Sequence, residues 1–295
     1  MAKETKNSIK EAKPSSNQQK IEEVTLTCGC NRDITLVEFG KIYKSQKQSV
    51  IEKFLPYINK TLETYNITSC LRKAHFLAQV GHESGQLSYI AEQLEKGVQE
   101  KDIYDGYKGR GLLQLTYKPN YVSYGNFVGH DFTENNKSDL ENTNWASDSA
   151  GWYWTKKQDP GLNEYADKND IIYITQAING AFNGYDDRHS LLKNSATALL
   201  IDNCPNQSTC WNMNEFNFEN SAAYNISGAA FGWGLWHDPS SNRSGVVKSI
   251  DKSIIGYRRF IELKDKQQKK RFGFKSVKEM IEHAELRISN MEHKK

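Results

Sequence analysis

The chain of 295 residues lacks any long hydrophobic run, and its formal net charge is only +3. No segment approaches the roughly 18 consecutive apolar residues that a membrane span requires. A charge this small gives no support for a nucleic-acid partner, and lysines and acids are mixed along the chain. The one basic run, KDKQQKKRFGFK, is expected to be a solvated helix face. We therefore predict neither a membrane span nor a nucleic-acid partner.

The N-terminal segment also lacks the apolar region of a secretory signal. Residues 1–22 are polar and lysine-rich without periodicity, which predicts a disordered arm. We therefore expect synthesis in the cytoplasm without a signal peptide.

Cysteine is scarce and odd in number, with residues at Cys28, Cys30, Cys70, Cys204 and Cys210. The spacings C-G-C and C-x5-C, with no nearby pair of histidines, do not match common zinc frameworks. A disulfide between Cys204 and Cys210 is one interpretation, because the two bracket a short loop, and free thiols are the other. On these grounds the sequence predicts no metal ion and no cofactor.

Helical patterns far outnumber strand patterns, so the expected fold class is mainly α, with at most a few short strands. We expect a disordered arm at 1–22 and a catalytic-type domain at 23–200. Residues 201–245 are rich in Asn, Ser and Gly and are expected to form an irregular insertion. Residues 246–295 should form C-terminal helices that pack on the same domain.

Two carboxylates, Glu83 and Glu92, lie at and just beyond the end of an apolar helical segment. Phe76, Val80 and Glu83 are spaced by four and three, so Glu83 continues the apolar stripe. Burial of this kind raises the pKa of a carboxyl and keeps it protonated near neutral pH. Glu92 instead precedes the polar, glycine-rich segment GRGLLQLT, where it should stay ionised. Such a pair is a weak signal alone, because most paired acids are solvated surface groups.

Other chemistries fit this stretch poorly. His82 and Glu83 begin a zinc-protease motif, but Gln86 occupies the position of the second histidine ligand. The glycines of GRG lack the lysine and the preceding strand of a phosphate-binding loop. Ser84 has no nucleophile motif around it. A pair of catalytic carboxylates therefore remains the best explanation of the chemistry of this stretch.

Four blocks between residues 70 and 192 resemble glycoside hydrolase family 19, which holds chitinases and many phage endolysins. The second block is the most specific, because it is close to the family signature Tyr-x-Gly-Arg-Gly-x-x-Gln-Leu-(Ser/Thr). The blocks follow one another in the family's order and are AHFLAQVGHESGQLSYIAEQ, YKGRGLLQLTYKPNYVSYG, WASDSAGWYWTK and TQAINGAFNGYDDR.

The resemblance implies a lysozyme-like α-helical fold and an inverting endo-glycosidase that cleaves β-1,4 bonds between N-acetylhexosamines. Glu83 would be the general acid and Glu92 the general base. In an inverting enzyme the two carboxyls lie about 6.5–9.5 Å apart, which leaves room for water.

The resemblance also implies roles in binding substrate or positioning water. Thr116 would hold the water, and Arg110 and Arg188 would pair with the two carboxylates. The groove lining and the hydrogen bonds to sugar hydroxyl and N-acetyl groups would come from His82, Gln114, Asn120 and Asn179.

The chain departs from the family pattern at Ala181, where a second glycine is usual, and at Pro119, where chitinases often have an aromatic residue. The loop between Glu92 and Gly109 is short, which favours bacterial peptidoglycan over chitin as the substrate. A chitinase and a catalytically silent carbohydrate-binding protein of the same fold are the alternatives.

Cleavage of peptidoglycan would lyse bacteria, so this interpretation predicts where and how the protein acts. We expect a monomeric, bacteriolytic, lysozyme-like endolysin or interbacterial effector that acts in the periplasm or cell wall after phage lysis or dedicated secretion. An effector of this kind would have a cognate immunity or inhibitor protein that plugs its groove.

Overall fold

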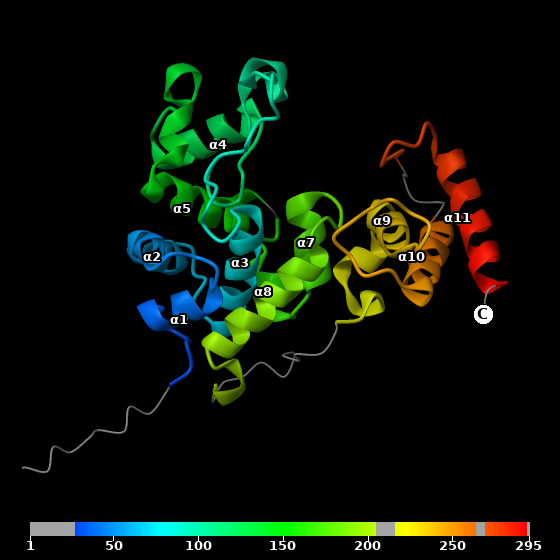
Figure 1. Ribbon diagram of the computed structural model, residues 1–295, viewed down its shortest axis with the longest axis horizontal. Coiled ribbons are helices and arrows are strands. Elements are labelled where there is room, and N and C mark those ends of the chain that lie inside the picture. The colour runs from blue at the N-terminus through cyan, green and yellow to red at the C-terminus, as the bar shows by residue number, and fades with distance from the viewer. Residues whose placement is uncertain (1–26, 158, 205–215, 264–268, 294–295) are drawn as a thin grey trace, which may run out of the picture.

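The chain folds as a succession of short helices (Figure 1), and the computed structural model describes residues 27–157, 159–204, 216–263 and 269–293. The predicted arm at 1–22 lies outside these residues. The α-helices are α1 (Leu36–Ile42), α2 (Gln48–Thr64), α3 (Cys70–Glu83), α4 (Lys118–Val128), α5 (Thr143–Trp152), α6 (Asn163–Asp167), α7 (Ile171–Asn179), α8 (Tyr185–Ala198), α9 (Ser227–His237), α10 (Ile250–Glu262) and α11 (Val277–Glu292).

Shorter helical turns connect these helices. They are η1 (Glu100–Asp102), η2 (Tyr104–Gly106), η3 (Glu134–Glu141), η4 (Tyr153–Lys157), η5 (Ile201–Asn203), η6 (Phe218–Asn220) and η7 (Ala222–Asn225).

Extended structure in the described residues is confined to two isolated antiparallel bridges, Ala91 with Arg110 and Arg110 with Leu115. The mainly α prediction is therefore confirmed. Within the same part of the chain, no helix is both long enough and apolar enough to cross a membrane.

The N-terminal helices begin where local chemistry predicts. The Thr35 side chain accepts a hydrogen bond from the Glu38 backbone N–H, and the Glu38 carboxylate accepts one from the Thr35 N–H. This capping box satisfies donors that the first turn leaves unpaired. α2 follows with Ile51, Phe54 and Ile58 buried along one face.

The central helix is α3, because nearly every residue from Cys70 to Gly81 is buried. It packs along α8, and α2 packs against α5. Phe76 meets the ring of Trp154 edge-on at 5.5 Å. His75, also fully buried, shares a 2.9 Å hydrogen bond with Asn169. A helix enclosed on all sides has little freedom to shift, so the residue at its end is held firmly.

The prediction of an irregular insertion at 201–245 is wrong at residues 227–237, where α9 lies. The Asn-, Ser- and Gly-rich composition hid this helix, whose glycines permit close packing rather than breaking it. The indole of Trp233 is buried against Phe182, Tyr185 and Phe218. This contact joins α9 to the helices that precede it.

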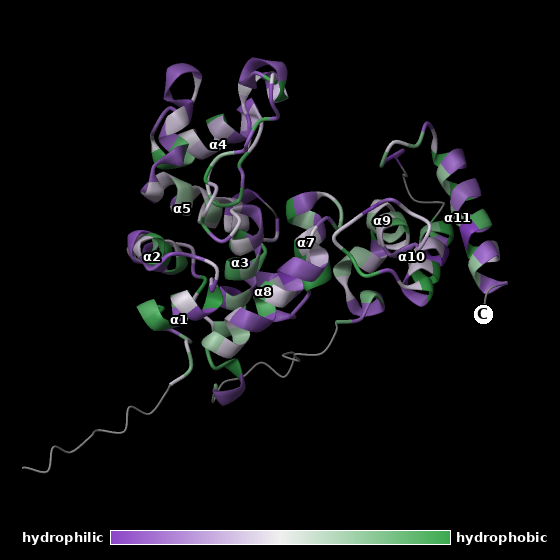
Figure 2. Cartoon of the chain, in the orientation of Figure 1, coloured by the Kyte–Doolittle hydropathy of each residue, from purple (hydrophilic) through white to green (hydrophobic). Residues whose placement is uncertain are grey.

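The two C-terminal helices predicted within 246–295 are present as α10 and α11, and α10 packs on both α9 and α11. Figure 2 shows hydrophilic and hydrophobic residues alternating along α11, as expected for a helix with one covered face. The boundaries proposed between domains stay predictions.

Two glycines allow α9 and α10 to approach closely. A Cβ atom at Gly256 would lie 2.3 Å from the backbone nitrogen of Gly234 and 2.8 Å from the carbonyl oxygen of Ala230. Backbone atoms cannot rotate away as a flexible side chain can, so an added methyl group must push the helices apart.

We predict that Gly256→Ala lowers the free energy of unfolding by about 2–3 kcal/mol through overpacking. Gly40→Ala is the matched control, because Gly40 lies within α1 with nothing near its Cβ position. It should leave stability unchanged or raise it by up to about 1 kcal/mol. Urea unfolding measures both, and equal effects would contradict the close helix contact.

Candidate active site

Glu83 is the last residue of α3, and its side chain is 18% exposed. Its Oε1 accepts a 2.5 Å hydrogen bond from Nη2 of Arg188, a fully buried residue of α8. The other terminal nitrogen of Arg188 donates to Oε1 of Gln79 at 2.5 Å. The ion pair implied for Arg188 and Glu83 is therefore present. The immediate neighbour of the carboxyl is a charged group, whereas the helix spacing indicated apolar surface.

A tight turn after Glu83 reverses the chain. The Ser84 hydroxyl donates to the Val80 carbonyl at 2.6 Å and accepts from the Leu87 N–H at 2.8 Å. Gly85, Gln86 and Leu87 all have positive φ, at 55°, 55° and 71°. Left-handed conformations cost energy in residues other than glycine, so the surrounding bonds must hold this turn in place.

Glu92 lies in a short extended segment that pairs with the backbone of the GRG sequence. Its N–H donates to the Gly109 carbonyl at 2.8 Å, and the Gly109 N–H donates to Oε2 of the Glu92 carboxylate at 3.0 Å. The Gly111 N–H donates to the Ile90 carbonyl at 2.8 Å. Glu92 is thus oriented by a neutral backbone donor, while Glu83 is oriented by a guanidinium.

Gln114 and Thr116 lie beside Gly109. A Cβ atom at Gly109 would be 2.8 Å from Oε1 of Gln114 and 3.4 Å from Oγ1 of Thr116. The same glycine binds the Glu92 carboxylate, so the structure brings Glu92, Gln114 and Thr116 together. Asn120 donates from Nδ2 to the Thr116 carbonyl at 2.7 Å and supports this segment from α4.

The prediction that Arg110 pairs with one of the two proposed catalytic carboxylates is wrong. Its buried guanidinium binds Glu100 through both terminal nitrogens, at 3.0 and 2.8 Å, and Glu141 through Nε at 2.7 Å. It also donates to the hydroxyl of Tyr121 at 3.1 Å. Arg110 therefore fixes the GRG segment to η1 and η3.

His82 and Asn179 lie on the Arg188 side of the site. Nδ1 of His82 is 2.6 Å from the Asp187 carboxylate. The Asn179 side chain accepts from the Asn183 backbone N–H at 3.3 Å, and the Asn183 carbonyl accepts from Nε of Arg188 at 3.3 Å. Asn179 is thereby linked to Glu83 through the buried arginine. The catalytic and binding roles of these residues stay predictions.

Two exposed tyrosines near Glu92 were missed by the sequence reasoning. Tyr104 and Tyr117 are 39% and 52% exposed, and their rings meet edge-on at 5.1 Å. The negative charge of Glu92 raises the pKa of the Tyr104 phenol, which places that ring close to the carboxylate. Exposed rings beside a carboxylate offer an apolar face and a polar hydroxyl to a sugar. The sequence has tyrosines on both sides of GRG, and this pattern could have identified the pair.

Comparison with known proteins gives a consistent set of relatives, although no protein-family model matches the chain. It is 28% identical over 208 residues to a glycosyl hydrolase family 19 domain-containing protein of Haemophilus influenzae, covering 57% of this chain and 96% of that relative. It is 33% identical over 89 residues to acidic endochitinase Q of Nicotiana tabacum and 30% identical over 120 residues to endochitinase EP3 of Arabidopsis thaliana. These matches cover 29% and 37% of this chain, and only 35% and 41% of the two plant enzymes.

Solved structures with some likeness are also chitinases. Chitinase C from Streptomyces griseus HUT6037 aligns with a TM-score of 0.47 and 23% identity, covering 59% of this chain and 79% of that one. A family GH19, class IV chitinase from Zea mays aligns with a TM-score of 0.38 and 20% identity, covering 61% and 89%.

We predict that Glu83→Gln lowers the free energy of unfolding by about 2 kcal/mol, because it leaves the buried Arg188 guanidinium without its carboxylate. Glu92→Gln is the matched control. Its amide oxygen can still accept from the Gly109 N–H, so the change should stay within about 0.5 kcal/mol. Urea unfolding of both variants measures the difference. An equal loss in both would refute the special role of the Arg188 pair.

Proposed function

We propose that the chain is a glycoside hydrolase of family 19, that it cleaves β-1,4 bonds between N-acetylhexosamines with inversion, and that its substrate is bacterial peptidoglycan. The observation that carries the proposal is the contrast between two carboxylates joined by one turn. Glu83 is held by the buried Arg188, and Glu92 is held by a backbone N–H beside Thr116.

Glu83 acts as the general acid. Its proton passes to the glycosidic oxygen as the bond between that oxygen and the anomeric carbon breaks. A negative charge develops on the carboxylate during this step, and the Arg188 guanidinium stabilises it at 2.5 Å. Gln79 and the Asn183 carbonyl fix the guanidinium in turn, so the acid keeps one orientation.

Glu92 acts as the general base. It takes a proton from a water molecule while the water oxygen bonds to the anomeric carbon on the face opposite the leaving group. The Gly109 N–H donates to one carboxylate oxygen and fixes the orientation of the carboxylate. Thr116 and Gln114, both adjacent to Gly109, supply the polar groups that position the water and the sugar.

Two observations favour peptidoglycan over chitin. The loop between Glu92 and Gly109 is short. A short loop encloses the substrate groove less, which suits a polymer with peptide branches. The plant endochitinases are matched over only 35% and 41% of their length, which weakens the case for chitin. Chitin hydrolysis is the second candidate, because those plant relatives are named as endochitinases.

A peptidoglycan hydrolase of this kind serves as an endolysin or an interbacterial effector. It acts in the periplasm or cell wall after phage lysis or dedicated secretion. An effector would be matched by an immunity or inhibitor protein that covers the surface around Glu83 and Glu92.

Parallel digestion of purified murein sacculi and chitin oligomers tests the substrate. Mass spectrometry of the products should show muropeptides with a new sugar reducing end and intact peptide bonds, and NMR of the first product should show inverted anomeric configuration. Activity on chitin alone would show that the substrate is chitin and that the peptidoglycan proposal is wrong.

Substitution of the two carboxylates tests the mechanism. Glu83→Gln and Glu92→Gln should each lower kcat by about 10²–10⁴, because general acid and base catalysis contribute on that order. Glu95→Gln, at an exposed acid of the same segment, should leave kcat unchanged. If both site variants kept full activity, the roles assigned here would be wrong. If the unmodified chain bound glycans without cleaving them, it would be a carbohydrate-binding relative.

A further inference from the structure

Four cysteines from distant parts of the sequence gather at one point. The sulfurs of Cys28, Cys30, Cys70 and Cys204 all lie within 4.8 Å of one another. The Sγ of Cys70 is 2.7 Å from that of Cys30 and 3.1 Å from that of Cys204, and Cys30 and Cys204 are 3.4 Å apart. The Cys204–Cys210 disulfide considered from the sequence stays a prediction, because Cys210 lies outside the described residues.

We propose that these four thiolates bind a single zinc ion, which ties three segments of the chain together. Zinc takes four thiolate ligands in a tetrahedron with zinc–sulfur bonds of about 2.3 Å, which separates the sulfurs by about 3.8 Å. The observed sulfur–sulfur distances run from 2.7 Å to no more than 4.8 Å and so bracket this value. Tetrahedral sulfur ligation selects zinc or an iron–sulfur centre, and a cluster this compact encloses one ion only.

The arrangement of the sulfurs argues against two disulfides. A disulfide joins sulfurs in exclusive pairs about 2.05 Å apart. Here Cys70 is close to Cys30 and to Cys204, and these two are also close to each other. Three sulfurs that each face the other two surround a common centre, which is the geometry of shared ligation.

The surroundings of the cluster suit a negatively charged zinc tetrathiolate. The backbone N–H of Cys70, at the start of α3, donates to the sulfur of Cys30 at 3.0 Å. The buried ammonium of Lys73 interacts electrostatically with the thiol groups of Cys70 and Cys30. Donors and a cation around the sulfurs offset the excess charge, as outer groups do in metal sites.

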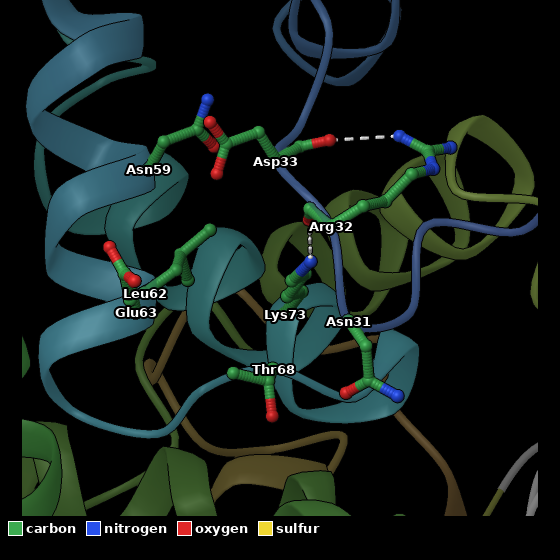
Figure 3. Close-up of a pocket in the computed structure, with 8 residues that line it drawn as sticks. All are labelled: Asn31, Arg32, Asp33, Asn59, Leu62, Glu63, Thr68 and Lys73. Carbon is green, nitrogen blue, oxygen red and sulfur yellow. Dashed lines mark hydrogen bonds between the residues drawn. The ribbon is translucent and has the colours of Figure 1, made fainter.

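The same lysine fixes the loop that carries two of the ligands. Figure 3 shows Lys73 pointing at the backbone of Arg32, and its Nζ donates to the carbonyls of Arg32 and Gly29, the latter at 2.7 Å. The Gly29 N–H donates to the Leu199 carbonyl at 2.8 Å, close in sequence to Cys204. A Cβ atom at Gly29 would be 2.7 Å from Leu199, so a glycine permits this approach.

The site is structural, because it lies at the opposite end of α3 from the catalytic candidates. α3 runs for 14 residues from Cys70 to Glu83, a length of about 20 Å. The zinc ion would bind the start of α3 to the loop before α1 and to η5 after α8. It makes no contact with the proposed chemistry, so the inference does not depend on the proposed function.

The test begins with the full chain, expressed with zinc in the medium and purified without chelator. Elemental analysis should find one zinc ion per chain. Cys70→Ser should lower the zinc content at least tenfold, whereas Cys210→Ser, the matched control, should retain it. Chelation of the unmodified protein should lower Tm by roughly 5–10 °C.

Alkylation with intact-mass analysis keeps the test decisive if Cys70→Ser fails to fold. In the unmodified protein, zinc should protect four thiols from iodoacetamide until chelator and denaturant are added, after which all four react without reductant. Two outcomes would overturn the proposal. One is zinc content well below one ion per chain with the thiols freely reactive. The other is a protein whose thiols react only after reduction, which would indicate disulfides.

Discussion

The ion pair between Glu83 and Arg188 is the contact on which the site depends. A guanidinium that is completely buried requires a carboxylate partner, and Glu83 supplies it from the end of α3. This requirement couples α3 to α8, the two helices that pack along each other at the centre of the fold. The residue proposed to donate a proton is therefore also part of the structural core, which explains why its position is so closely determined.

The helix α3 is constrained at both of its ends. At its start, Cys70 and Lys73 contact the loop around Gly29, and at its end Glu83 contacts Arg188. The middle of the helix is buried among apolar side chains. A rigid helix with fixed ends presents Glu83 to the turn beyond it with little freedom, and pre-positioning of this kind benefits catalysis.

Local patterns in the sequence predicted much of this structure, whereas they could not predict contacts between residues far apart in the chain. The helix that ends at Glu83 follows from the spacing of its apolar residues. Arg110 was assigned the wrong partners, because two other acids compete for it across distant loops. The cysteine cluster was missed for the same reason: its members come from three segments, and no local spacing predicts that they meet.

The two carboxylates illustrate why environment decides function more than position in the sequence. In the proposed reaction, the Arg188 guanidinium at 2.5 Å would stabilise the anion that forms when Glu83 donates its proton. A single backbone N–H orients Glu92 and leaves its charge uncompensated by any cation that the described residues place on its carboxylate. The two proposed catalytic carboxylates thus differ in what holds them, because a buried guanidinium binds Glu83 and a backbone N–H binds Glu92.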